Sequence, residues 1–213
     1  MTGCCKVILV DDHAVVRAGY RLLLSQTRDI EIVAEAETGE EACHLYWRHQ
    51  PDVVVMDLNL PGIGGLAAIR RILGRAPEAR VLVFSIHDEP VYVSRAREAG
   101  ALGYISKSCP PEMLVEAVIS TAAGKPFLEP AIARRMKGPD HDVNATPLER
   151  LTPREFDVLC RLARGLSTRE TAQELRLSAK TVSNYLTSIK EKLHVATTAE
   201  LVRLAYRLQL IAD

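Results

Sequence analysis

The 213-residue sequence predicts an α/β domain with a doubly wound parallel sheet, followed by an all-helical domain. Over residues 5–124, five short apolar segments alternate with five segments of helical periodicity. Such alternation is typical of an open parallel sheet with helices on both faces. From residue 151 onward, helical periodicity continues without a strand-like segment. Between them lies a stretch of mixed charge with four prolines, which predicts a linker.

The expected strands are short apolar runs bounded by polar or turn-forming residues. They are residues 6–10, 30–34, 53–56, 81–84 and 103–105. The expected helices between and after them are residues 13–25, 39–48, 65–75, 90–99 and 112–123. Thr38 and Glu41 have the spacing of a capping box, and Pro90 suits a first helical turn.

These patterns predict a first domain at residues 1–125, a linker at 126–148 and a helical domain at 149–213. The linker is expected to hold at most a short helix, at residues 131–136. In the helical domain, three further capping boxes begin at Thr152, Ser167 and Thr197. The final helix, residues 198–208, carries leucines that suit either a dimer contact or the domain core.

The composition is that of an ordinary globular protein, with 47 % hydrophobic and 25 % charged residues. No apolar run could span a bilayer, and the first residues lack a signal-peptide core, so a cytoplasmic protein with no membrane partner is expected. The five cysteines form no C-x-x-C pair and are expected to be reduced. Residues 1–125 carry 13 Lys and Arg against 16 Asp and Glu, whereas residues 126–213 carry 14 against 11. The second half is therefore the better candidate for binding nucleic acid.

Polar side chains follow the expected strands at the edge of the sheet where parallel strands end and ligands bind. Asp11 and Asp12 follow the first strand, Asp57 the third, Ser85 the fourth, and Lys107 lies just past the fifth. A cluster of like charges is tolerable when a divalent cation lies in it, and Mg²⁺ favours carboxylates together with a phosphate oxygen. Lys107 and Ser85 could hold the other oxygens of a phosphoryl group.

Asp57 is the candidate nucleophile, because it ends a rigid buried strand and an aspartate nucleophile forms an acyl phosphate. Taken singly, these residues have simpler explanations. Asp11 could cap a helix, Lys107 could be a solvated surface charge, and Tyr104 could be a packing residue. His13 is better explained by packing or capping than as a ligand. Without a phosphoryl-transfer site, all of these separate explanations would have to be true at once. A single phosphoryl-transfer site accounts for the residues together and is therefore favoured.

The helical domain contains a second constellation, in a short helix at 168–175 and a longer helix that follows the N-cap Ser178. The apolar stripe of the longer helix consists of Val182, Leu186, Ile189 and Leu193. Its other face offers side chains suited to base edges and phosphates in a major groove. These are Lys180, Thr181, Ser183, Asn184, Thr187, Ser188 and Lys190. A generic helical bundle with a solvated polar face remains the alternative to DNA binding.

The N-terminal half resembles the receiver domain of two-component response regulators. The matching segments are VDDH (10–13), VVMDLNLPG (54–62), VFSIHD (83–88) and AGALGYISKS (99–108). The resemblance implies phosphorylation of Asp57 by a sensor histidine kinase. It also implies Mg²⁺ bound by Asp12, Asp57 and the backbone carbonyl of Asn59, with Asp11 contributing through water, and a switch pair formed by Ser85 and Tyr104. In such domains, residues at the positions of Asn59 and His87 tune dephosphorylation, and both are expected at the rim.

The C-terminal region resembles the LuxR-type helix-turn-helix domain of the NarL/FixJ family. The matching residues are LTPRE at 151–155, GLS at 165–167, KTV at 180–182 and KL at 192–193. The resemblance implies a four-helix DNA-binding domain that binds promoter DNA as a homodimer. Many members carry histidine where this chain has Tyr185, so base contacts are not transferred from them.

Together these features predict a response regulator that acts on transcription and is not an enzyme. An aspartate-based phosphatase is the first alternative, but it needs a second carboxylate where this chain has Asn59. A regulator that ignores phosphate would not need Asp12, Asp57 and Lys107 together. A small-molecule quorum receptor would have no reason for this acidic crevice.

Overall fold

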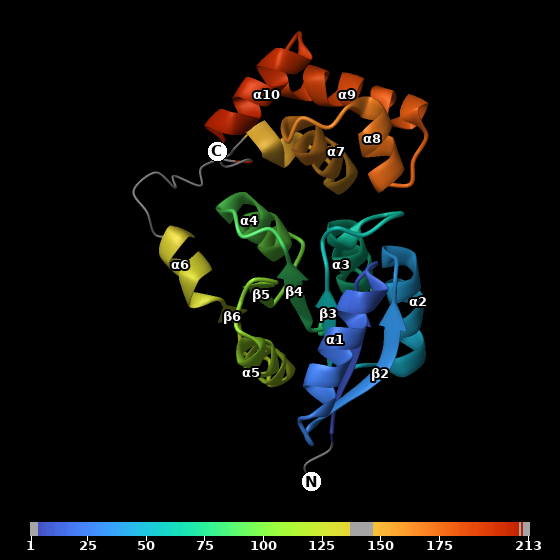
Figure 1. Cartoon of the computed structure of the whole chain (residues 1–213), viewed down its shortest axis with the longest axis vertical. Coiled ribbons are helices and arrows are strands. Elements are labelled where there is room, and N and C mark those ends of the chain that lie inside the picture. The colour runs from blue at the N-terminus through green and yellow to red at the C-terminus, as the bar shows by residue number, and fades with distance from the viewer. Residues whose placement is uncertain (1–3, 137–146, 209, 211–213) are drawn as a thin grey trace. The chain divides into compact units, whose positions relative to one another are not determined.

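The computed structural model describes residues 4–136, 147–208 and 210. The chain divides into two compact units, Met1–Lys137 and Gly138–Asp213. The first is an α/β unit built on a parallel sheet, and the second is helical (Figure 1). The predicted fold class is confirmed.

The sheet of the first unit has the strand order β2-β1-β3-β4-β5-β6, and all its strands are parallel. The strands are β1 Cys5–Val10, β2 Ile30–Ala36, β3 Val53–Met56, β4 Val81–Ser85, β5 Gly103–Ser106 and β6 Phe127–Leu128. The order reverses at β1, which lies between β2 and β3. Such a switch point leaves a crevice at the carboxyl ends of the strands.

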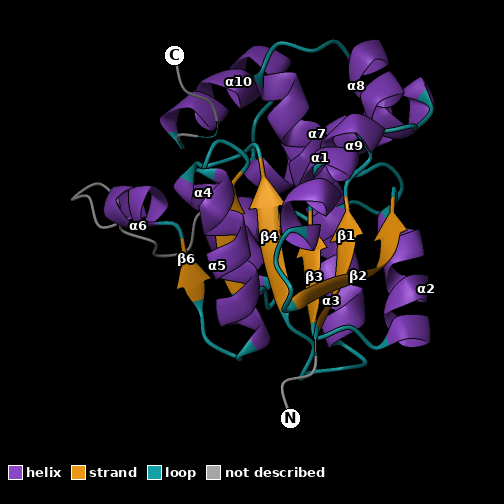
Figure 2. Cartoon of the chain, turned by 60° about the horizontal axis from the view of Figure 1, so that its bottom comes forward, coloured by secondary structure: helices purple, strands orange, loops and turns teal. Residues whose placement is uncertain are grey.

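Helices cover both faces of the sheet (Figure 2). They are α1 Ala14–Ser25, α2 Gly39–His49, α3 Gly65–Leu73, α4 Pro90–Glu98 and α5 Pro111–Ala122. Apolar residues of α1 and α5 pack with alternate residues of the strands, for example Val7 and Leu9 of β1. The period of two along a strand places these side chains on one face. Helices α2 and α3 lie against each other on the opposite face.

The sixth strand was not predicted. β6 pairs with β5, and Glu129 continues the pairing by donating its amide to the Tyr104 carbonyl at 3.1 Å. The helix α6 Pro130–Met136 follows and also lies in the first unit. The N-terminal part of the predicted linker is therefore part of the sheet. A two-residue strand between Pro126 and Pro130 gives almost no periodicity, and the two prolines lie just outside the strand at the edge of the sheet.

The second unit opens with the 3₁₀ turn η1 Pro147–Arg150. Among the described residues, four α-helices follow it: α7 Pro153–Ala163, α8 Thr168–Glu174, α9 Ala179–Leu193 and α10 Thr198–Arg207. The stripe predicted on α9 faces the core, with Val182, Ile189 and Leu193 buried and Leu186 half-buried. On α10, Leu201 and Ala205 are buried in the described unit, so these two residues serve the core.

The capping boxes at Thr152, Ser167 and Thr197 are present in full. At Thr38 only half of the predicted box forms. The Thr38 hydroxyl accepts the Glu41 amide, but the Glu41 carboxylate accepts from the amide of Glu37 instead of that of Thr38. Across the described part of the chain, every helix is too short or too polar to cross a membrane.

Candidate functional site

The acidic crevice lies where β1, β3 and β5 end. Asp11 follows β1 and Asp57 follows β3, and both are buried, with 4 % and 2 % of their surface exposed. Lys107 follows β5, and its Nζ lies 2.6 Å from Asp11 Oδ2 and 2.6 Å from Asp57 Oδ2. Residues from positions 11, 57 and 107 therefore meet at one point because three parallel strands end at the same edge.

The ammonium group of Lys107 shapes the electrostatics of this crevice. Burial raises the pKa of the Asp57 carboxyl, and the neighbouring Lys107 opposes that rise. Burial alone would lower the pKa of Lys107, but the carboxylates of Asp57 and Asp11 outweigh it and raise that pKa. Lys107 therefore stays protonated and holds two carboxylates together that would otherwise repel each other.

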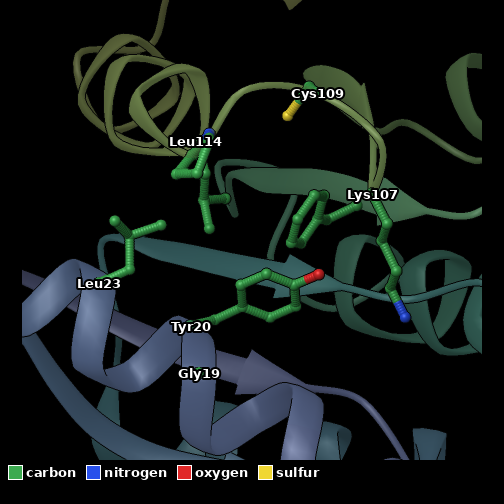
Figure 3. A pocket seen from close by; sticks show the side chains of 8 residues that line it. Gly19, Tyr20, Leu23, Lys107, Cys109 and Leu114 are labelled. Atoms are coloured by element: carbon green, nitrogen blue, oxygen red, sulfur yellow. The ribbon is translucent and has the colours of Figure 1, made fainter.

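An apolar wall supports the stem of Lys107. An apolar cavity of about 270 Å³ lies between α1 and α5, lined by Tyr20 and Leu114 among others. The Tyr20 ring meets Phe84 edge to face, with 4.6 Å between ring centroids. Figure 3 shows that the ammonium end of Lys107 points away from these side chains. The methylene stem thus packs on apolar surface while the charged end reaches the carboxylates.

Asp12 takes no part in the two ion pairs that Lys107 makes with Asp11 and Asp57. Its Oδ1 is buried and accepts no hydrogen bond from any described residue. The His13 Nδ1 lies 2.9 Å from that oxygen without hydrogen-bonding geometry, and His13 is mostly exposed. Among the described residues, the crevice therefore holds three carboxylates and the ammonium of Lys107, and one of the carboxylate oxygens is buried without a hydrogen-bond donor. Carboxylate oxygens in such surplus suit a hard divalent cation.

The donor set that could hold a cation is compact. Ligand atoms of Asp11, Asp12 and His13 lie within 4.8 Å of one another. Asp57 belongs to the same crevice through Lys107, and its Oδ1 accepts the Asn59 amide at 3.2 Å. The residues present fit a magnesium ion on the side of Asp12, because Lys107 already occupies the side between Asp11 and Asp57.

The expected switch pair lies beside the crevice. Ser85 is fully buried at the end of β4, and its Oγ accepts the His87 amide at 3.4 Å. Tyr104 is buried on β5, and its hydroxyl donates to the His87 carbonyl at 2.8 Å. Burial raises the pKa of Tyr104 well above its usual range, so the phenol stays neutral and can donate.

His87 lies elsewhere than predicted. It was expected at the rim, but only 3 % of it is exposed, and its ring stacks on Tyr92 with 4.0 Å between centroids and 4° between planes. Aromatic stacking with Tyr92 draws the ring inward, and sequence spacing gives no sign of that contact.

The second candidate site is the outer face of α9. Lys180, Ser183, Asn184 and Thr187 are exposed, as the position of the buried stripe requires. Thr181 and Lys190 are half-exposed, and Thr181 also donates its amide to the N-cap Ser178. These side chains offer hydroxyl, amide and ammonium groups along one helix face.

Ser188 does not belong to that face, which corrects the prediction. Its hydroxyl donates to Glu155 Oε1 at 2.6 Å, so the side chain is directed inward. The reason is an acceptor 33 residues earlier in the sequence, which helical periodicity alone does not reveal.

Glu155 anchors α9 to α7. Besides Ser188, it accepts from Lys192 Nζ at 2.8 and 2.6 Å and from the Thr152 amide at 2.7 Å. Burial alone would raise the pKa of Glu155, but the hydrogen bonds from Lys192, Ser188 and Thr152 outweigh it and lower that pKa to about 2. The sequence places Glu155 in a capping box and in the LTPRE segment, and the structure shows that it also anchors α9.

Arg17 of α1 is another residue that the sequence analysis did not identify. It is a buried arginine that donates to the backbone of the acidic crevice. The signal was available, since a charged residue stands among the apolar positions of a helix that begins next to two aspartates.

Fold and site together define a protein that joins a receiver domain to a helix-turn-helix domain. Residues 7–119 match the family of response regulator receiver domains, and residues 149–205 match the bacterial regulatory proteins of the luxR family. The chain belongs to the two-component response regulators with a LuxR-type DNA-binding domain, the NarL/FixJ type. Its curated relatives are regulators of transcription.

Among those relatives, the transcriptional activator protein ExaE of Pseudomonas putida is 43 % identical over 93 % of this chain and 94 % of its own length. The oxygen regulatory protein NreC of Staphylococcus carnosus is 35 % identical over 97 % of this chain and 99 % of its own. RcsB of Salmonella enterica, solved bound to a promoter, is 26 % identical with a TM-score of 0.64, over 94 % of this chain and 97 % of its own.

Proposed function

We propose that phosphorylation of Asp57 by a sensor histidine kinase controls the binding of this chain to promoter DNA. The observation that carries the proposal is the meeting of Asp57, Asp11 and Lys107 within hydrogen-bonding distance in a buried crevice. A buried aspartate destabilises the fold unless a positive group pairs with it. Here one ammonium faces the two carboxylates of Asp11 and Asp57, which leaves surplus negative charge. That surplus favours a site for a divalent cation, which can in turn hold an oxygen of a phosphoryl group.

In the proposed reaction, an Asp57 carboxylate oxygen attacks the phosphorus of phosphohistidine and forms an acyl phosphate, while the imidazole of the kinase leaves. Lys107, already 2.6 Å from Asp57 Oδ2, stays close enough to neutralise the arriving phosphoryl oxygens. A bound Mg²⁺ supplies charge neutralisation of the phosphoryl group. Asp12, Asp57 and the carbonyl of Asn59 would hold it, with Asp11 contributing through water.

The proposed switch uses Ser85 and Tyr104. The Ser85 hydroxyl lies at the strand end beside the crevice, where it can turn toward a phosphoryl oxygen. Tyr104 is already inward, with its hydroxyl on the His87 carbonyl. Because His87 belongs to the β4–α4 loop, a movement of Ser85 changes the loop that Tyr104 contacts.

The proposed DNA contacts come from the outer face of α9. Ser183, Asn184 and Thr187 are the candidates for base edges, and Lys180, Thr181 and Lys190 for phosphates. One solved relative is described as two RcsB dimers bound to two parallel DNAs. We therefore propose that this chain binds DNA as a homodimer on an inverted repeat, and that phosphorylation tightens binding by promoting pairing.

Labelling with a small phosphodonor and Mg²⁺ tests the phosphoacceptor. We expect Asp57→Asn to abolish labelling, because it removes the nucleophile. Asp52→Asn is the matched control, since Asp52 precedes β3 as Asp57 follows it and its carboxylate accepts the Lys6 amide outside the crevice. Undiminished labelling of Asp57→Asn would contradict the proposal. DNA binding that is identical with and without phosphodonor would favour the alternative of a phosphate-independent regulator.

Binding selections on variants of α9 test the DNA contacts. Asn184→Ala is expected to cost roughly 1–3 kcal/mol and to relax the preference at one or two base pairs, because Asn can bond adenine bidentately. Lys180→Ala should weaken all sequences alike and reduce the salt slope by about one unit. If Lys180→Ala changes base preference and Asn184→Ala does not, the proposed assignment of the helix face is wrong.

A further inference from the structure

The guanidinium of Arg17 contacts the acidic crevice through the backbone carbonyl of Asp11. Only 8 % of Arg17 is exposed. Its three nitrogens donate to three different acceptors: the Asp11 carbonyl at 2.5 Å, Glu37 Oε1 at 2.7 Å and Glu35 Oε2 at 3.3 Å. One side chain thus joins the β1–α1 loop, the strand β2 and the loop between β2 and α2.

The Asp11 carbonyl is part of the peptide that joins Asp11 to Asp12. Because a peptide is planar, fixing its oxygen also fixes the direction in which the chain enters Asp12. The remaining polar groups of Asp11 are held as well: its amide donates to the Ala36 carbonyl, and its carboxylate accepts from Lys107 and from the His13 amide. Arg17 supplies the contact that completes this set.

Asp12, in contrast, depends on its backbone for its direction. Its buried Oδ1 receives no hydrogen bond from any described residue. The position of its carboxylate therefore follows from the peptide before it, and that peptide is held by Arg17.

A role for Arg17 confined to pinning α1 against β2 does not explain its burial. Arg21 already makes such a pin, since its NH1 donates to Glu35 Oε1 at 2.9 Å while its side chain remains 58 % exposed. Removing a guanidinium from water costs several kcal/mol before its partners offset that loss. An exposed arginine would connect the two elements at lower cost, but it would not reach the Asp11 carbonyl.

We propose that Arg17 is a positioning residue for the metal and phosphoryl site, which sets the direction of the Asp12 carboxylate toward a divalent cation through the Asp11–Asp12 peptide. The inference rests on the proposed function, because it assumes that the crevice binds Mg²⁺. Residues that orient metal ligands typically change metal affinity by 10- to 100-fold when they are replaced.

Two variants of Arg17 separate geometry from charge. Arg17→Lys keeps the positive charge, but a point-like ammonium cannot replace a planar fork that meets three acceptors. Arg17→Met keeps the length and removes the charge. Arg21→Met is the matched control, because Arg21 binds the same Glu35 and, among the described hydrogen bonds, makes none to Asp11.

The measurements are the Mg²⁺ dissociation constant of the full chain by calorimetry and the Mg²⁺ concentration that half-saturates labelling by a small phosphodonor. We expect both Arg17 variants to raise the dissociation constant about tenfold or more. The maximal labelling rate at saturating Mg²⁺ should be largely recovered, since Asp57 and Lys107 are intact. Arg21→Met should stay within about twofold of the wild type.

A folded Arg17→Lys variant with unchanged Mg²⁺ affinity would overturn the proposal, and Arg17 would then be a structural pin. Equal weakening by Arg21→Met would also overturn it, because the effect would come from the charge near Glu35 and not from the Asp11 carbonyl. If the wild-type chain itself bound no Mg²⁺, the proposed function would fail first. Urea unfolding followed by Trp47 fluorescence shows that each variant is folded.

Discussion

The two units each bury a cluster of charged residues, and the clusters differ in how completely they are satisfied. In the helical unit, both oxygens of Glu155 are hydrogen-bonded, by Ser188, Lys192 and the Thr152 amide. In the acidic crevice, Asp11 and Asp57 share the ammonium of Lys107, and Asp12 Oδ1 has no hydrogen-bond donor among the described residues.

This difference distinguishes a structural cluster from a ligand site. A buried charge that is fully paired needs nothing from outside, and its removal costs stability. A cluster with surplus charge is destabilised by its own repulsion until a ligand of opposite sign arrives. Removing a carboxylate should therefore have opposite effects on stability in the two places.

The largest effect is expected from Glu155→Gln. The variant should lower the free energy of unfolding of the helical unit by about 3 kcal/mol, because it leaves Lys192 without its ionic partner. Circular dichroism in urea measures both units, and Trp47, the only tryptophan, reports on the first unit alone. Glu170→Gln is the control, since it removes an exposed capping-box carboxylate. Equal midpoints for the two variants would contradict the comparison.

A somewhat smaller effect should appear with pH. The pKa of Glu155 is about 2 in the folded chain, against an ordinary value of 4.5. A lowered pKa contributes stability that is fully present above about pH 4.5 and is lost as the pH falls toward 2. Between pH 5 and pH 3 the helical unit should lose about 2 kcal/mol from this group. The loss should be absent in Glu155→Gln, and urea unfolding at each pH measures it.

Asp12→Asn should have the opposite sign. Without divalent cations, the variant should stabilise the first unit by about 1 kcal/mol, because one surplus negative charge is gone. Millimolar Mg²⁺ should then stabilise the wild type and have little effect on the variant. Trp47 fluorescence in urea measures both changes. A variant that is less stable than the wild type in the absence of Mg²⁺ would show that the crevice is satisfied as it stands.

The smallest effect is expected at an exposed ion pair. Arg135 of α6 lies 2.7 Å from Asp88 Oδ2, with 45 % and 38 % of the two side chains exposed. Solvent screens such a pair, so Asp88→Ala should change the free energy of unfolding by less than about 0.5 kcal/mol. The measurement is the same as for Asp12→Asn. A decrease in the free energy of unfolding above about 1 kcal/mol would mean that the exposure of an ion pair does not predict its contribution to stability in this chain.

Local periodicity was sufficient to predict most of the fold. Runs such as Val53–Met56 are apolar on both faces, as a central parallel strand must be, and the stripe of α9 appears as predicted. The polar residues that end the strands were also predictable from the sequence, and the parallel sheet brings two of them, Asp57 and Lys107, together at the same edge. The two-residue strand β6 was not predictable in this way, because its pairing with β5 and not its own pattern makes it a strand.

By itself, the sequence determined which residues are apolar, where helices are capped and which polar groups end the strands, because these depend on neighbours within a few positions. Tertiary structure decided the direction of polar side chains that lie beside an apolar stripe. Ser188 turns inward because Glu155, 33 residues away, accepts its hydroxyl. Arg17 is buried because it forms ion pairs with Glu35 and Glu37, which lie 18 and 20 residues away in the sequence. A buried polar group is stable only where a partner meets it, and folding alone brings such distant partners into contact.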